Sequence, residues 1–104
     1  MTNKEYNGWH NYETWLVNLW MDNDGSDAYW RECAERLVKD DPGAAIRSMA
    51  DLIKEEHEQR WSEINNDKAS VLSDLMNAAF SEVNWEEIAS HYIDEVEVEE
   101  EAVA

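Results

Sequence analysis

Helical spacing of apolar residues runs through most of this chain, and its clearest example lies in residues 6–24. Five apolar side chains there recur at positions i, i+3, i+4, i+7 and i+8: Tyr12, Trp15, Leu16, Leu19 and Trp20. This spacing places all five on one face of an α-helix. Asn11, directly before them, can cap the helix by accepting a backbone N–H. Because two indoles and a phenol carry a large apolar area, we expect this helix to form the centre of the core.

Four further segments have the same periodicity, at about 27–39, 42–65, 68–83 and from 84 onward. Asp41 and the chain's single proline, Pro42, predict the start of the third helix, because proline suits the first helical position. The side chains expected to face the core are Trp30, Cys33, Ala34 and Leu37, then Ile46, Met49, Ile53, Trp61 and Ile64, then Leu72, Leu75, Met76, Ala79 and Val83, then Trp85, Ile88, Ala89, Tyr92 and Val96. We predict an all-α fold: a compact bundle of four or five helices in a single domain over 1–96, followed by an acidic, disordered tail at 97–104.

The charge of the chain restricts its partners. It contains 25 acidic and 8 basic residues, for a net charge of −17, and residues 69–104 contain no Lys or Arg at all. Direct binding to nucleic acid or to an anionic membrane is disfavoured, because phosphate contacts would be repulsive. The partners expected for such a chain are basic proteins or nucleoprotein complexes.

The residues that could carry catalysis or metal binding do not form a known motif. The acidic run 22–27 resembles a calcium loop, but Gly25 falls at position 4 rather than 6, and Cys33 falls at position 12, where the loop needs glutamate. A helix-ending turn explains the same run, with cation binding as the alternative. The histidines are far apart, and His57 is expected to be a partly buried, hydrogen-bonded side chain. We therefore predict no enzyme activity, no metal and no cofactor.

The sequence also predicts a cytoplasmic protein. The N-terminal residues contain no apolar signal region, and no segment approaches the ~18 apolar residues that span a membrane. The single cysteine, Cys33, has no partner within the chain for a disulfide, which is typical of a reducing compartment.

Residues 6–24 resemble the opening of small uncharacterised proteins from phages, plasmids and other mobile elements, which share a GW-N-ETW-V-LW--ND pattern. The residues that carry the resemblance are Tyr6-Asn7-Gly8-Trp9, Asn11, Glu13-Thr14-Trp15, Val17, Leu19-Trp20 and Asn23-Asp24. The resemblance implies a mobile-element protein acting in a host cell, and it supplies no activity and no catalytic residues. The polar members can be explained as a helix cap and first turn, with Trp9 folding back onto the helix. The alternative is that Trp9 and His10 are exposed as binding anchors.

Two function hypotheses follow. The first is an acidic inhibitor or DNA mimic, of the anti-CRISPR or anti-restriction type, that blocks a basic nucleic-acid-binding site of a host protein. The partner-binding residues expected for it are Asp51, Glu55, Glu58, Glu86, Glu87, Asp94, Glu97, Glu99, Glu100 and Glu101. The second is a small adaptor or homo-oligomeric structural protein that uses the tryptophan-rich helices as its interface.

Overall fold

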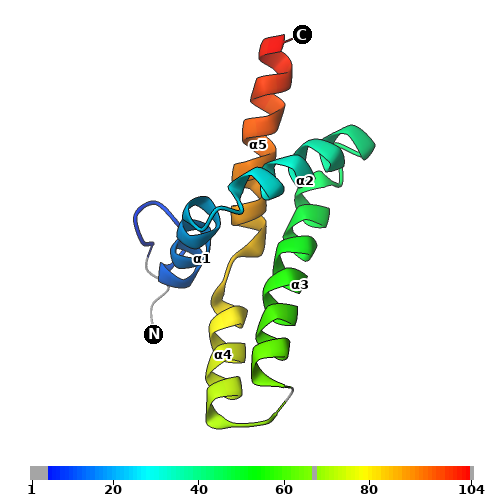
Figure 1. Ribbon diagram of the computed structural model, residues 1–104. Coiled ribbons are helices and arrows are strands. Elements are labelled where there is room, and N and C mark those ends of the chain that lie inside the picture. The colour runs from blue at the N-terminus through cyan, green and yellow to red at the C-terminus, as the bar shows by residue number, and fades with distance from the viewer. Residues whose placement is uncertain (1–4, 67, 104) are drawn as a thin grey trace.

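The long helix α3 (Ala45–Asn65) lies beside the two helices that follow it, α4 (Val71–Glu82) and α5 (Trp85–Val103) (Figure 1). The computed structural model describes residues 5–66 and 68–103, with side chains through Glu97. α4 runs beside the C-terminal half of α3, and α5 continues in nearly the same direction beside the N-terminal half (Figure 1). α2 (Asp27–Asp40) packs across α3 and α5, and α1 (Tyr12–Asn23) contacts α2, α4 and α5. The predicted all-α fold is confirmed.

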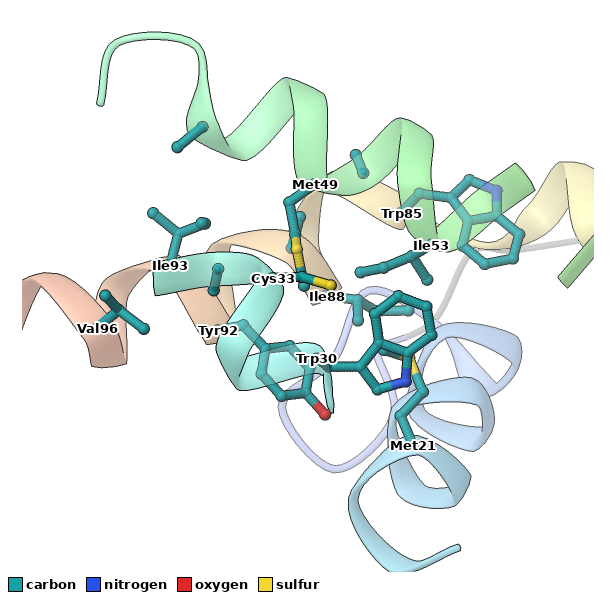
Figure 2. Packing of buried hydrophobic residues seen from close by; sticks show 14 of the residues in the cluster. Met21, Trp30, Cys33, Met49, Ile53, Trp85, Ile88, Tyr92, Ile93 and Val96 are labelled. Carbon is teal, nitrogen blue, oxygen red and sulfur yellow. The ribbon is translucent and has the colours of Figure 1, made fainter. Parts of the chain in front are cut away.

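One apolar core is formed between α2, α3 and α5, with Met21 added from α1 (Figure 2). Met49, Ile53 and Ile88 are fully buried at its centre. The sequence prediction is confirmed for α5, whose expected residues are all buried, and for most of α2, where Val38 is buried more deeply than Leu37. Burial of a large aliphatic side chain contributes about 1.5–3 kcal/mol, so this three-helix contact is the main source of stability.

Polar side chains mark the ends of several helices. Asn11 Oδ1 accepts the Thr14 N–H at 2.9 Å, and Asn84 Oδ1 accepts the Glu87 N–H at 3.1 Å, as expected for N-caps. Ser70 and Ser73 form a reciprocal capping box that starts α4. Asn66, with φ of 54°, ends α3 in the left-handed conformation that asparagine tolerates.

The predicted core face of α1 is wrong. Tyr12, Leu19 and Trp20 are 46%, 38% and 63% exposed, whereas the buried residues of this helix are Thr14, Asn18 and Met21. The apolar spacing identified the helix, but the helix presents its more polar side to the rest of the protein. The physical reason is a hydrogen-bond network, described below, that ties this polar side to the α4–α5 connection.

Two further predictions about the middle of the chain are wrong. α3 begins at Ala45 rather than Pro42, because Asp41 ends α2 and then accepts the Gly43 N–H (3.1 Å) in a turn through 42–44. α4 begins at Val71 rather than residue 68, and two of its expected core residues, Leu72 and Leu75, are 64% and 62% exposed. Because α4 lies beyond the edge of the core, no other helix covers this face among the described residues.

The C-terminal end of the chain, residues 97–104, was predicted to be an acidic, disordered tail. α5 is helical as far as Val103, so it includes most of the segment 97–104. The side chains beyond Glu97 lie outside the described residues, and the disorder of the tail stays a prediction. Within the described part, no helix is long and apolar enough to cross a membrane.

Candidate functional site

The N-terminal signature builds a tight turn that folds back on α1. Asn7 and Gly8 both have positive φ, 49° and 87°, and Tyr6 and Trp9 exchange two backbone hydrogen bonds of 2.8 Å across them. Positive φ at both central positions defines a type I′ turn, for which Asn-Gly is the preferred sequence. The turn brings the Trp9 ring onto the His91 ring of α5, stacked at a centroid distance of 4.8 Å.

Polar residues of the signature connect α1 to the junction between α4 and α5. Thr14 Oγ1 donates to Asn11 Oδ1 at 2.6 Å and accepts the Asn84 N–H at 2.9 Å. Asn11 Nδ2 donates to the Glu82 carbonyl at 2.6 Å. Asn11 and Thr14 are buried, so the bond between them is shielded from water, and the bonds to Glu82 and Asn84 are partly shielded. The structural interpretation of these two residues is confirmed. The signal was present in the sequence as a polar series at i, i+3 and i+7, ending at Asn18.

The opposite side of α1 presents aromatic rings to solvent. Tyr6, Tyr12 and Trp15 contact one another, with ring centroids 4.8–5.6 Å apart. Trp20, at 63% exposure, is the most exposed large aromatic side chain in the described part of the chain. Tyrosine and tryptophan are enriched in protein–protein contacts because they combine large apolar area with a polar edge. This surface is therefore a candidate contact site.

The predicted acidic partner-binding residues lie on two helices that pack together. On α5, Glu86, Asp94 and Glu97 are exposed, while Glu87 is half-buried and accepts the His10 N–H at 2.9 Å. On α3, Asp51, Glu55 and Glu58 are exposed. Glu99, Glu100 and Glu101 lie outside the residues whose side chains are described.

The two helices differ in charge. Residues 85–97 of α5 contain five acids and no Lys or Arg, whereas α3 also contains Arg47, Lys54 and Arg60. Among the described residues, Arg31 on α2 lies 3.5 Å from Glu95, and none of the six exposed acids named above forms an ion pair. The acidic surface is therefore strongest along α5 and mixed along α3.

Two of the carboxylates in the acidic run 22–27 make structural hydrogen bonds. Asp22 accepts the Tyr92 hydroxyl at 2.7 Å and the Asn18 side-chain amide at 3.0 Å. Asp24 accepts the Ser26 hydroxyl and N–H, and these bonds lower the pKa of its carboxyl. No group of three or more His, Cys, Asp or Glu residues suited to a metal ion is present among the described residues.

Histidine and cysteine side chains are part of the packing. The His57 ring lies between the Trp30 and Trp85 rings, and its Nδ1 is 2.8 Å from the Ile53 carbonyl, as expected for a partly buried, hydrogen-bonded histidine. Cys33 is buried in the core. A hydrogen bond between Cys33 and the Tyr29 hydroxyl raises the pKa of Tyr29.

Three hollows on the described surface differ in size and lining. The most highly charged, about 170 Å³, lies between α1, α2 and α5 and is lined by Asp22, Asp27, Arg31, His91, Tyr92 and Glu95. Small-molecule pockets usually measure about 300–1,000 Å³, so it is small for a metabolite. Two open hollows of about 350 Å³ lie between α3 and α4. The one beside Trp85 has a mixed polar and apolar lining, and the one beside Trp61 is lined largely by polar residues. The exposed surfaces are therefore the stronger candidates.

Comparison with known proteins places the chain in a family. A family model matches residues 2–102, which is nearly the whole sequence. The chain belongs to DUF7249. DUF7249 is a family of unknown function, so membership assigns neither an activity nor a partner. No curated protein and no solved structure matches the chain.

Proposed function

We propose that the protein is a non-enzymatic inhibitor that binds a basic, nucleic-acid-binding site of another protein through the acidic side chains of α5 and α3. The observation that carries the proposal is the acidic surface of α5. Glu86, Asp94 and Glu97 are exposed there without an ion-pair partner among the described residues, and residues 85–97 contain no Lys or Arg. An unneutralised carboxylate surface of this kind complements a cluster of Lys and Arg side chains.

The spacing of these carboxylates supports the comparison with nucleic acid. A helix rises about 1.5 Å per residue, so Glu86 and Glu97 lie roughly 16 Å apart along α5, and Asp51 and Glu58 roughly 10 Å apart along α3. A nucleic-acid strand carries one phosphate charge per ~3.4 Å. The two packed helices therefore present negative charge over the length of a few nucleotides, at lower density than DNA.

The mechanism proposed is electrostatic attraction followed by close contact. The net charge of −17 attracts the target and raises the rate of encounter. Exposed rings of the α1 aromatic surface, such as Trp20, offer apolar contact area once the partner is docked. The resemblance to mobile-element proteins favours a target among host defence proteins of the restriction or CRISPR type, or other DNA-handling proteins.

A capture experiment with matched variants tests this proposal. Tagged protein is incubated with nuclease-treated lysate, and retained proteins are eluted with rising salt or with duplex DNA. We expect the retained proteins to be basic nucleic-acid-binding proteins, and we expect both salt and duplex DNA to release them. The triple variant Glu86→Gln/Asp94→Asn/Glu97→Gln should lose them.

The matched control, Glu32→Gln/Glu35→Gln/Asp40→Asn, removes the same charge from exposed positions on α2 and should retain the target. Equal loss in both variants would show that only net charge matters. Retention that neither salt nor DNA reverses would contradict the proposal.

The exposed aromatic surface of α1 favours a second candidate function, a small adaptor or homo-oligomeric structural protein. Tyr12, Leu19 and Trp20 form an apolar surface that no other helix covers in the described chain. A partner bound there by apolar contact would stay bound at high salt. Substitution of Trp20 by Gln should then release the partner, whereas the α5 triple variant should not.

A further inference from the structure

The solvent-facing side of α1 presents a tryptophan ring beside a carboxylate. Trp20 is 63% exposed, whereas Trp15 of the same helix packs against Tyr6 and Tyr12. The Asp24 N–H donates to the Trp20 carbonyl at 2.8 Å, so Asp24 follows Trp20 by one helical turn. Residues one turn apart are neighbours on a helix surface. The Trp20 ring and the Asp24 carboxylate therefore border the same patch of surface.

The carboxylate of Asp24 has an oxygen left for a cation. Ser26 donates its hydroxyl and its N–H to Oδ1 of Asp24, and no hydrogen bond to Oδ2 is present among the described residues. The bonds from Ser26, with a smaller contribution from Arg60 of α3, lower the pKa of the Asp24 carboxyl, so it is ionised at neutral pH. Arg60 forms no ion pair with Asp24 in the described part of the chain. Asp24 therefore presents negative charge next to the exposed ring.

Negative charge surrounds this ring along the sequence as well. Segment 5–30 covers the N-terminal turn, α1 and the start of α2, and it contains five acids and no Lys or Arg. One of these acids, Glu13, precedes Trp20 by seven residues, which places it on the same side of α1. Glu13 and Asp24 thus lie on either side of Trp20 along the helix. This charge favours a cationic partner.

Other occupants fit the patch less well. An apolar surface that covered Trp20 would also remove water from the Asp24 carboxylate without supplying a counter-charge, which is unfavourable. A second copy of the chain, related by a two-fold axis, would bring Glu13 and Asp24 toward the same carboxylates in the other subunit. The phosphates of nucleic acid would be repelled. A cationic side chain, in contrast, contacts the ring and neutralises the carboxylate.

We infer that Trp20 and Asp24 form a docking point for an arginine side chain of the basic partner. A planar guanidinium stacks on an indole face by cation–π attraction while its N–H groups bond to a carboxylate. A lysine ammonium is a compact, strongly hydrated charge without a plane to stack. The inference rests on the function proposed above for the basic character of the partner. It adds the type of residue that is recognised, and it assigns the aromatic side of α1 to that partner.

Charge-matched peptides test the docking point. Hexa-arginine and hexa-lysine carry the same charge, so a difference in their affinity, measured by titration calorimetry at low salt, reports stacking rather than net charge. We expect wild type to bind hexa-arginine about 5-fold more tightly than hexa-lysine. Trp20→Leu leaves the net charge unchanged at an exposed position, and it should bind the two peptides equally. Asp24→Asn keeps an acceptor for Ser26 but removes the charge, and it should bind hexa-arginine more weakly than wild type.

Nuclear magnetic resonance locates the contact. The indole N–H signal of Trp20 is identified by its absence from the spectrum of Trp20→Leu, and it should shift with hexa-arginine and much less with hexa-lysine. Tyr29→Leu is the matched control, because it removes an exposed aromatic ring from α2 and should keep the preference for arginine. Both variants change exposed side chains, so their helical circular dichroism should equal that of wild type.

The outcomes separate this inference from the function proposed above. Equal affinity of wild type for the two peptides, no binding of either, or an arginine preference that persists in Trp20→Leu overturns the inference. The triple variant Glu86→Gln/Asp94→Asn/Glu97→Gln should bind both peptides more weakly and still prefer arginine. Loss of the preference in that variant would assign it to α5 and also overturn the inference. The proposed function is decided by the capture experiment, where it fails if the same triple variant retains the target.

Discussion

The hydroxyl of Thr14 connects the N-terminal segment to the α4–α5 junction, so its removal should destabilise the fold. Thr14 is fully buried, and its Oγ1 accepts the Asn84 N–H while donating to Asn11 Oδ1. Valine has nearly the same shape but can do neither. Thr14→Val leaves the Asn84 N–H without its acceptor, at a cost of about 1–3 kcal/mol, whereas Asn11 Oδ1 still accepts the Thr14 backbone N–H. We expect a loss of about 2 kcal/mol.

The measurement is urea or thermal unfolding followed by circular dichroism. A loss of about 2 kcal/mol corresponds to a fall of roughly 8–16 °C in Tm for a domain of this size. Thr14→Ser is the control, because it keeps the hydroxyl and loses one methyl group, at about 0.8 kcal/mol. The reasoning is refuted if valine is as stable as threonine, or if serine is destabilised as much as valine.

Two further predictions concern the core. Burial and the hydrogen bond to Asp22 raise the pKa of the Tyr92 phenol well above its ordinary 10.0. Above pH 10 the unfolded chain loses this proton while the folded protein keeps it, so the free energy of unfolding should fall as pH rises. The fall should be less steep in Tyr92→Phe, and urea unfolding at graded pH measures both slopes. Met49→Ala, at a fully buried position, should cost about 2–5 kcal/mol in unfolding, and a loss below about 1 kcal/mol would contradict the packing described for α3.

The sequence predicted the existence of every helix, because apolar spacing is a local property. In α5 the spaced residues, such as Ile88 and Tyr92, are also the buried ones, since this helix packs against both α2 and α3. The proline prediction failed because Asp41 can end one helix as readily as it can start another. Boundaries depend on such competition between neighbouring turns.

The faces of α1 and α4 could not be predicted in the same way. Periodicity shows which side of a helix is apolar, but it does not show whether another element covers that side. Thr14 is buried because its hydrogen-bond partner is Asn84, 70 residues away. The polar series that ends at Asn18 marks a polar side of α1, but it does not indicate which element that side contacts. Leu72 is exposed because α4 lies outside the core, which depends on the length and direction of α3. The exposure of the acidic candidate residues was easier to predict, because charged side chains are normally at the surface.

The bonds that hold the N-terminal segment also set an order of events during synthesis. Asn11, Thr14 and His10 form hydrogen bonds with residues 70–77 positions further along the chain, at Glu82, Asn84 and Glu87 respectively. A ribosome adding about 5–20 residues per second needs roughly 4–14 s to make the intervening segment. During that interval the polar side of α1 lacks its hydrogen-bond partners, and the aromatic side is exposed as well. The first helix to be synthesised thus cannot complete these contacts until the α4–α5 junction has been made, and a nascent chain stalled before Asn84 should expose it to chaperones.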